Sequence, residues 1–213
     1  MSQKEGARAY GRGQGFSRPV PNYHLSPAKE ELRKKILPAR QKLENSGQLS
    51  GRICRRIFSW EVFKHAGRIL SYCPVRGEAD ISPVNDYVSR RGVLYLPAVP
   101  PVQGSGKESM RALRYGQLAP GRFGIPSPPP GNPEISPEAL DLVLVPGIVF
   151  DKTGGRLGFG SGFYDDFLKD CAAPKAGVCF RMQVVENVPH DLKDVRMDFI
   201  VTEDGISETK KGG

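Results

Sequence analysis

The stretch of sequence that decides the fold reads DLVLVPGIVFDKTGGRLGFGSGFYDD and runs from Asp141 to Asp166. It opens with a continuous apolar run, Leu142–Val145, and strands that are buried on both faces of a parallel sheet have this pattern. A glycine-rich loop follows the strand, and a helix is expected from about Phe163. This order of strand, loop and helix is typical of proteins in which strands and helices alternate.

The rest of the chain alternates in the same way. Helices are expected from residue 26, with a kink or an interruption at Pro38, and over residues 49–65 and 83–91. Strands are expected over residues 68–73, 92–97, 110–115, 177–180 and 199–202, and a proline-rich irregular connector over 120–137. The alternation predicts an α/β fold with a mostly parallel sheet in a single domain.

Length and charge restrict the possible functions. A chain of 213 residues is long enough for one packed domain and short for two. Its formal net charge of +8 indicates either a nucleic-acid binder or an enzyme that handles polyanionic small molecules. The sequence has no apolar run of about 18 residues, the length that a membrane-spanning helix needs, so no membrane partner is expected.

The first 27 residues are expected to form a disordered basic tail, because glycines interrupt any helix there. They contain no apolar signal-peptide core, and the four cysteines of the chain lack metal-binding spacing. These features predict free thiols in a reducing compartment and a cytoplasmic location. A mitochondrial transit peptide fits less well, since its amphipathic helix would have to contain several glycines.

The glycine-rich loop suits phosphate groups. Glycines leave backbone N–H groups accessible to phosphate oxygens, and a helix that starts after the loop adds positive potential. Arg156 adds a forked donor, and a carboxylate at Asp165 can hold Mg²⁺ against phosphate oxygens. The loop lacks the Gly-Lys-Ser/Thr ending of a Walker A motif, and Phe163 stands where a dinucleotide-binding loop requires glycine. On these residues alone, a tight strand-to-helix connection is the alternative.

The same segment resembles the signature of the 5-formyltetrahydrofolate cyclo-ligases, also called methenyltetrahydrofolate synthetases. The resemblance rests on Leu144–Asp151, Arg156–Gly158 and Gly162–Asp165, together with Gly154 and Gly160. Further similar positions follow in order along the chain: Lys29–Arg33, Tyr72–Pro74, Gly77–Asp80, Leu96–Pro97, Met110, Gly124–Pro126, Gln183, Pro189, Asp194, Asp198 and Thr202–Glu203. They place a cyclo-ligase domain at residues 28–206, between the tail at 1–27 and a C-terminal tail at 207–213.

The resemblance implies a three-layer α/β/α domain with a Rossmann-like sheet, similar to the sugar-phosphate isomerase and CoA-transferase folds. It also implies an ATP- and Mg²⁺-dependent ligase that converts 5-formyltetrahydrofolate to 5,10-methenyltetrahydrofolate and releases ADP and phosphate. In that family the formyl oxygen takes the γ-phosphate, and the neighbouring folate nitrogen then attacks the activated carbon. Such chemistry depends on positioning and charge neutralisation more than on a protein nucleophile. A monomer is expected.

The resemblance also assigns site residues. For ATP they are Lys29, Arg33, Arg156, Leu157, Gly158, Phe159, Gly160, Ser161, Gly162, Phe163 and Tyr164. For the folate they are Cys73, Glu78, Phe159, Gly160, Ser161, Gly162 and Phe163. Asp165 and Asp194 match the Mg²⁺ positions, and Arg156 and Tyr164 are the expected catalytic residues. Lys29 and Arg33 are four residues apart and so share one helix face, which can also be read as a solvated basic face.

Two of these assignments have simpler alternatives. Glu78 also fits a surface acid in a turn, and Asp194 lies so close to Asp191 and Asp198 that a shift in alignment changes the choice between them.

Three residues depart from the family's pattern. Ser161 stands where several members carry Lys or Gly, Phe163 replaces a commoner Tyr, and Lys193 replaces a usual His or Asn. They leave open a second hypothesis, a diverged relative that binds a nucleotide or another phosphorylated metabolite without cyclo-ligase activity. A third hypothesis is nucleic-acid binding through the basic tail. It lacks an aromatic-flanked RNA motif and is not the expected main function.

Overall fold

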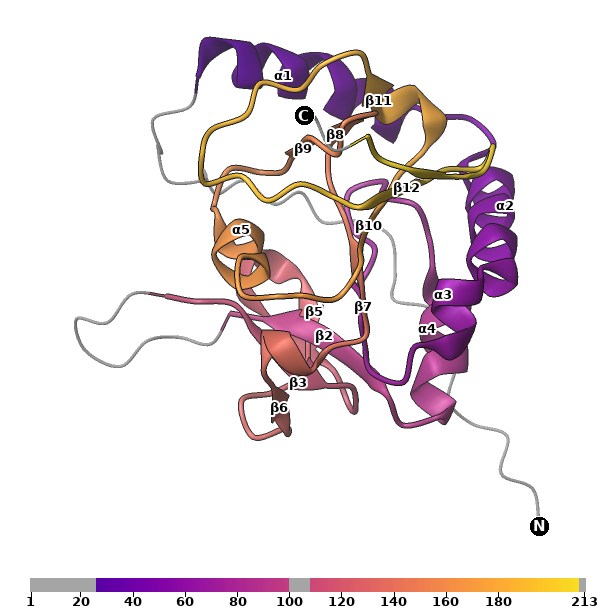
Figure 1. The fold of residues 1–213 in the computed structure, drawn as a ribbon, viewed down its shortest axis with the longest axis vertical. Coiled ribbons are helices and arrows are strands. Elements are labelled where there is room, and N and C mark those ends of the chain that lie inside the picture. The colour runs from indigo at the N-terminus through magenta and orange to yellow at the C-terminus, as the bar shows by residue number, and fades with distance from the viewer. Residues whose placement is uncertain (1–25, 100–107, 211–213) are drawn as a thin grey trace.

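A computed structural model describes residues 26–99 and 108–210 of the chain. Within these residues, an eight-stranded sheet has the order β13-β12-β10-β7-β1-β2-β3-β6 (Figure 1). The strands are β1 (Ile69–Leu70), β2 (Leu94–Ala98), β3 (Arg111–Arg114), β6 (Glu134–Ile135), β7 (Leu142–Val145), β10 (Lys175–Val178), β12 (Phe199–Val201) and β13 (Ile206–Glu208). From β12 through β10, β7 and β1 to β2 all pairings are parallel, and β13, β3 and β6 add antiparallel edges. The mostly parallel sheet predicted from the sequence is confirmed.

The structure bears on only one of the two predicted tails. Residues 1–25, which make up nearly all of the predicted basic tail, lie outside the described residues. At the other end the fold continues past residue 206, because β13 pairs with β12 and the Thr209 hydroxyl donates to the Met197 carbonyl oxygen at 2.7 Å. The folded part therefore includes residues that the sequence analysis placed in a C-terminal tail.

The position of β7 inside the sheet explains its unbroken apolar sequence. Leu142 and Leu144 belong to the hydrophobic cluster on one face of the sheet, and Val143 and Val145 belong to the cluster on the other face. Successive side chains of a strand point to opposite faces, so a strand that is covered on both sides needs an apolar residue at every position.

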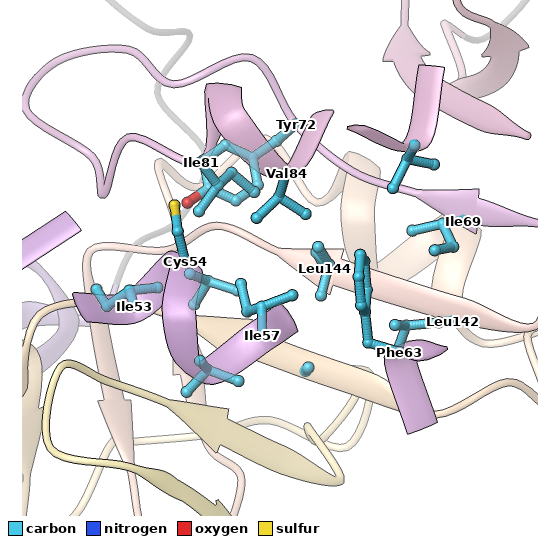
Figure 2. Packing of buried hydrophobic residues seen from close by; sticks show 14 of the residues in the cluster. Ile53, Cys54, Ile57, Phe63, Ile69, Tyr72, Ile81, Val84, Leu142 and Leu144 are labelled. Carbon is cyan, nitrogen blue, oxygen red and sulfur yellow. The ribbon is translucent and has the colours of Figure 1, made fainter. Parts of the chain in front are cut away.

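Three helices cover the face of the sheet that carries Leu142 and Leu144: α2 (Ser46–Ser59), α3 (Glu61–His65) and α4 (Ser82–Arg90). Figure 2 shows Ile57 of α2 and Phe63 of α3 in the same cluster as these two leucines. The prediction of one helix over 49–65 is wrong, because Trp60 has an extended backbone with φ −83° and ψ 124°. That bend accompanies an edge-on contact between the Trp60 and Phe199 rings, whose centroids are 4.9 Å apart.

On the opposite face, Phe167 and Leu168 of α5 (Phe163–Leu168) join the cluster that contains Val143 and Val145. Figure 1 shows α5 on one side of β7 and the helices α2 to α4 on the other. The resulting order of helix, sheet and helix is the predicted three-layer α/β/α arrangement.

The first helix, α1 (Pro27–Gln41), packs on a separate small sheet of β11 (Val184–Val185), β8 (Val149–Asp151) and β9 (Arg156–Leu157), as Figure 1 shows at the upper edge of the molecule. Of the two outcomes predicted for Pro38, the interruption is wrong, because α1 continues through this residue. A proline in a helix removes one backbone hydrogen bond, and here the turn that follows is held by the buried guanidinium of Arg40.

The proline-rich segment is more regular than the irregular connector predicted over 120–137. It contains β4 (Ala119–Pro120), the 3₁₀ turn η1 (Arg122–Gly124), β5 (Pro126–Ser127) and the 3₁₀ turn η2 (Pro137–Ala139), with β6 between β5 and η2. β4 pairs with β5, and β6 pairs with β3 at the edge of the main sheet. A further 3₁₀ turn, η3 (Arg181–Gln183), precedes β11. Across the described ranges, every helix is too short or too polar to cross a membrane.

Candidate active site

The glycine-rich loop begins in a tight hairpin between β8 and β9, which the carboxylate of Asp151 organises. Asp151 is buried and accepts hydrogen bonds from the backbone N–H groups of Thr153, Gly155 and Val188 at 2.8, 2.9 and 2.8 Å, and from the Thr153 hydroxyl at 2.8 Å. Burial alone would raise the pKa of Asp151, but these hydrogen bonds lower it below its usual range. A side chain at Gly155 would place Cβ only 2.4 Å from Asp151 Oδ2. These residues therefore shape the loop.

Arg156 lies at the base of the loop with little freedom to move. Its Nη2 donates to both carboxylate oxygens of Asp165 at 2.8 Å, and its side chain is only 6% exposed. The backbone N–H of Val195 donates to Asp165 Oδ1 at 3.2 Å, so the segment that carries Asp194 reaches the same place. The Arg156 guanidinium also lies 5.5 Å from the centre of the Tyr164 ring. Four predicted site residues thus lie together.

The two basic residues of α1 reach this site from the other side. Lys29 Nζ donates to Asp191 Oδ2 and Asp194 Oδ2, both at 2.7 Å, and Arg33 Nε donates to the Gly158 carbonyl oxygen at 2.8 Å. Burial alone would lower the pKa of Lys29, but the two aspartates raise it above its usual value. Burial lowers the pKa of Arg33. The alternative of a solvated basic face is wrong for both residues.

The aspartates near residue 194 separate into two groups. Asp194 and Asp191 share Lys29, and the Asp191 backbone N–H also donates to Asp194 Oδ2 at 2.8 Å. Asp198 lies elsewhere, because its carboxylate pairs with the ammonium and the backbone N–H of Lys175, the first residue of β10, at 3.1 and 2.9 Å. Asp198 thus does not share the Lys29 contact that joins Asp191 and Asp194, and the latter two stay the candidates for a metal position.

Glu78, Cys73 and Tyr164 form the third part of the site. The Glu78 carboxylate accepts a hydrogen bond from the Val75 backbone N–H at 3.0 Å, and burial raises the pKa of Glu78 to about 7. Burial also raises the pKa of Cys73, to about 11, and that of Tyr164, and the charge of Glu78 adds to both effects. Glu78 is therefore a half-buried carboxylate beside two other site residues, which excludes the alternative of a solvated surface acid.

The tip of the loop combines backbone turns with two aromatic rings. Gly160 and Gly162 have φ of +97° and +72°, a region that favours glycine. The guanidinium of Arg76 lies 4.7 Å from the centre of the Phe159 ring, and that of Arg122 lies 6.0 Å from the centre of the Phe163 ring. Ser161 is half-buried between the two glycines.

Leu157 occupies a different environment from the rest of the loop. Its side chain is buried in the cluster with Ile36 and Val149, and its carbonyl oxygen accepts a hydrogen bond from the Ile148 N–H at 2.7 Å. Leu157 thus joins the loop to α1 and β8 through apolar packing.

The family model for the 5-formyltetrahydrofolate cyclo-ligase family matches residues 25–203, which is most of the chain. The chain belongs to this family. The resemblance read from the sequence is confirmed.

This chain aligns with different shares of the relatives named 5-formyltetrahydrofolate cyclo-ligase. The one from Escherichia coli K12 is 25% identical over 170 residues, which cover 78% of this chain and 93% of that protein. The one from Mus musculus is 36% identical over 86 residues, 35% of this chain and 42% of the relative. The one from Saccharomyces cerevisiae is 45% identical over 76 residues, 32% of this chain and 36% of the relative. The chain thus aligns with less than half of the mouse and yeast cyclo-ligases.

Solved structures agree with this membership. The NMR structure of Aquifex aeolicus 5,10-methenyltetrahydrofolate synthetase superposes with a TM-score of 0.74 at 35% identity, covering 87% of this chain and 94% of that one. A 5,10-methenyltetrahydrofolate synthetase from Mycoplasma pneumoniae superposes with a TM-score of 0.65 at 22% identity, covering 82% and 98%, and supports the fold.

The site contains polar atoms that lack protein partners. Among the described residues, Arg33 Nη1, Arg156 Nε, Tyr164 Oη and Arg40 Nε are buried without a hydrogen bond. Buried polar groups are nearly always paired, so unpaired donors at one site fit an anionic ligand that the structure does not contain. The first three belong to residues predicted to bind ATP, and their chemistry fits phosphate groups.

The residues predicted for Mg²⁺ fit a weaker kind of site. No group of three or more His, Cys, Asp or Glu side chains that could hold a metal occurs within the described residues. Asp165 and Asp194 pair with Arg156 and Lys29 instead. Mg²⁺ commonly takes only one or two carboxylates and completes its shell with water and substrate phosphates. Two carboxylates beside a phosphate site therefore fit Mg²⁺ that arrives with a nucleotide.

Proposed function

We propose that this chain is an ATP- and Mg²⁺-dependent 5-formyltetrahydrofolate cyclo-ligase, which forms 5,10-methenyltetrahydrofolate and releases ADP and phosphate. The observation that carries the proposal is the meeting of Arg156, Tyr164 and Glu78 at one place. Arg156 Nε and Tyr164 Oη are buried without partners, and Glu78 is a half-buried carboxylate electrostatically coupled to Tyr164. Donors for phosphate and an acceptor for a second ligand thus lie side by side.

The residues divide between the two substrates. Arg156 lies at the base of the glycine loop and Arg33 contacts the Gly158 carbonyl oxygen of the loop, and the unpaired N–H groups of both donate to the phosphates of ATP. Lys29, now between two aspartates, adds a third positive charge at the same end. Asp165 and Asp194 hold Mg²⁺, which supplies charge neutralisation on the phosphate oxygens.

The folate binds on the other side of the loop. Glu78 accepts hydrogen bonds from N–H groups of the folate ring, and Cys73 forms part of the same wall. Tyr164 Oη, between Glu78 and Arg156, donates toward the oxygen atoms that carry charge during phosphate transfer. Half-burial of the loop residues limits water around the reacting atoms.

A single assay tests the proposal. The full-length protein is mixed with ATP, Mg²⁺ and 5-formyltetrahydrofolate, and the absorbance of the methenyl product is followed together with ADP release. We expect product formation that depends on all three components, with one ADP per methenyl group formed. Absence of turnover at every Mg²⁺ concentration overturns the proposal. Thermal stabilisation by ATP with no response to folate would then favour the diverged nucleotide-binding relative suggested by Ser161.

A further inference from the structure

One deeply buried charge near the site belongs to a residue that the proposed reaction does not use. Arg40, in the last turn of α1, is 1% exposed. Its Nη1 donates to the Gly147 carbonyl oxygen at 2.8 Å, its Nη2 donates to the Arg76 carbonyl oxygen at 2.9 Å, and its Nε has no partner. Burial lowers the pKa of Arg40. A buried guanidinium that is bonded only to carbonyl oxygens is unfavourable in isolation, so its position calls for an explanation.

The first partner of Arg40 leads to the glycine loop. Gly147 follows β7 and precedes β8, the strand that enters the loop hairpin. The Gly147 carbonyl oxygen also accepts a hydrogen bond from Gln183 Nε2 at 3.0 Å, and Gln183 Nε2 reaches the Ile148 carbonyl oxygen at 3.0 Å. Gln183 and Arg40 therefore donate to the same Gly147 carbonyl oxygen. Among the described residues, only Arg40 of these two also bonds to the Arg76 carbonyl oxygen.

The second partner leads to Glu78. Arg76 and Gly77 both have a left-handed backbone, with φ of +50° and +75°, and this conformation is uncommon for an arginine. The hydrogen bond from Arg40 Nη2 holds the Arg76 carbonyl oxygen inside this turn. Directly after the turn, Glu78 folds back onto the Val75 N–H, and the Arg76 guanidinium covers the Phe159 ring of the loop tip. The turn thus meets the tip of the glycine loop through the Arg76 contact with Phe159.

Arg40 is also a charge that faces Glu78. The charged or titratable groups around Glu78 come from three elements and are Arg40 of α1, Arg76, Tyr72 and Cys73 of the segment after β1, and Tyr164 of α5. Arg40 and Arg76 are the two cations among them, and both oppose the effect of burial on the pKa of Glu78. Arg76 is exposed, whereas Arg40 is shielded from solvent.

We propose that Arg40 is a positioning residue for Glu78, and that its guanidinium ties the turn carrying Glu78 to Gly147 so that the folate side and the phosphate side of the pocket keep a fixed separation. This inference rests on the proposed function and adds a role for a residue that contacts neither substrate. The planar fork of arginine reaches two carbonyl oxygens from different segments at once, and the single ammonium of lysine does not reproduce that geometry.

The experiment compares Arg40→Met and Arg40→Lys with Gln183→Met, which loses the Gln183 hydrogen bond to the Gly147 carbonyl oxygen and keeps both hydrogen bonds of Arg40. In Arg40→Met we expect the KM for 5-formyltetrahydrofolate to rise about 10- to 100-fold while the KM for ATP changes less than about twofold. The acidic limb of the kcat/KM profile should move to higher pH, since Glu78 loses its buried cation. In Arg40→Lys the acidic limb should return to its wild-type pH, because lysine keeps the positive charge. The KM for 5-formyltetrahydrofolate should stay raised, because lysine does not bond both carbonyl oxygens.

Amide hydrogen exchange provides a readout that needs no turnover. In both Arg40 variants, peptides covering residues 74–80 should exchange faster than in wild type, and in Gln183→Met they should not. If wild type has no activity, the proposed function fails while exchange still tests the positioning role. Wild-type KM and exchange in a folded Arg40→Lys or Arg40→Met protein would overturn the inference. The inference is also overturned if Gln183→Met reproduces every change, because the loss of a hydrogen bond to Gly147 alone would then account for the effects.

Discussion

Arg156 and Asp165 form an ion pair in which one guanidinium nitrogen lies 2.8 Å from both carboxylate oxygens. The pair joins β9 to α5 across the glycine loop, and it leaves Arg156 Nε buried without a partner. Asp165 therefore fixes the direction in which the unpaired Nε–H of Arg156 points. Held in this way, an arginine can stabilise charge on a ligand with little reorganisation.

Removing that arginine should stop the reaction without unfolding the protein. We expect Arg156→Ala and Arg156→Lys each to lower kcat by about 100-fold or more, because a lysine cannot hold Asp165 and donate to the ligand together. The matched control is Arg68→Lys, since Arg68 also uses two bonds to one aspartate, Asp141, at 3.2 and 2.9 Å. Steady-state rates of the methenyl assay measure both. An Arg156→Lys enzyme with wild-type kcat would contradict the assignment.

Glu78 should make the protein less stable as the pH rises. Burial raises the pKa of Glu78 in the folded state to about 7, above the ordinary value of 4.5, so between these values the folded state binds more protons than the unfolded state. The free energy of unfolding therefore falls through this range as pH rises, by roughly 3 kcal/mol. Glu78→Gln removes this dependence, so its stability relative to wild type should be higher at pH 8 than at pH 5.

Urea denaturation at the two pH values measures the difference, and Glu44→Gln, at an exposed position, is the control. The same Glu78→Gln protein should bind 5-formyltetrahydrofolate more weakly, because an amide replaces an acceptor oxygen with a donor. Equal stability differences at pH 5 and pH 8 would show that Glu78 is ionised and solvated in the folded protein.

Asp151 should support the loop through stability and not through chemistry. Asp151→Asn replaces an oxygen that faces backbone N–H donors with an NH₂ group, and we expect a loss of about 3 kcal/mol in the free energy of unfolding at pH 7. Since the hydrogen bonds lower the pKa of Asp151, its stabilisation is present above the ordinary pKa and is lost as the pH falls through the lowered value. The loss relative to wild type should therefore shrink in acid. Asp170→Asn, at an exposed position, should change stability little at either pH.

Some of these elements can be predicted from the sequence, because a local pattern of residue types is enough to define them. A strand covered on both faces must be apolar throughout, so Leu142–Val145 identifies the centre of the sheet. The loop and the pair Lys29 and Arg33 are local patterns as well. The break at Trp60 is different, because apolar periodicity continues on both sides of it and the contact that accompanies the bend, with Phe199, lies far along the chain.

The residues that sequence reasoning missed are buried polar groups with distant partners. Arg40 bonds to Gly147, 107 positions away, and Asp151 bonds to Val188, 37 positions away. In a sequence, Arg40 looks the same as a charged residue on the surface. Asp191 stands out in the sequence only as a neighbour of Asp194, because its bond to Lys29 spans 162 positions. A signal was present for Asp151 alone, since an aspartate followed by Gly154 and Gly155 is typical of a tight turn.

The choice between Asp194 and Asp191 as the Mg²⁺ position can be decided by substitution. Both carboxylates contact Lys29 at 2.7 Å, but the Asp194 side chain is 24% exposed and that of Asp191 is 75% exposed. Asp194 also precedes Val195, whose N–H contacts Asp165, so Asp194 lies on the segment that meets the second metal candidate. We therefore expect Asp194→Asn to raise the Mg²⁺ concentration for half-maximal rate about tenfold or more, and Asp191→Asn to raise it less than about twofold. The reverse order would move the metal position to Asp191, and equal effects would mean that both act through Lys29.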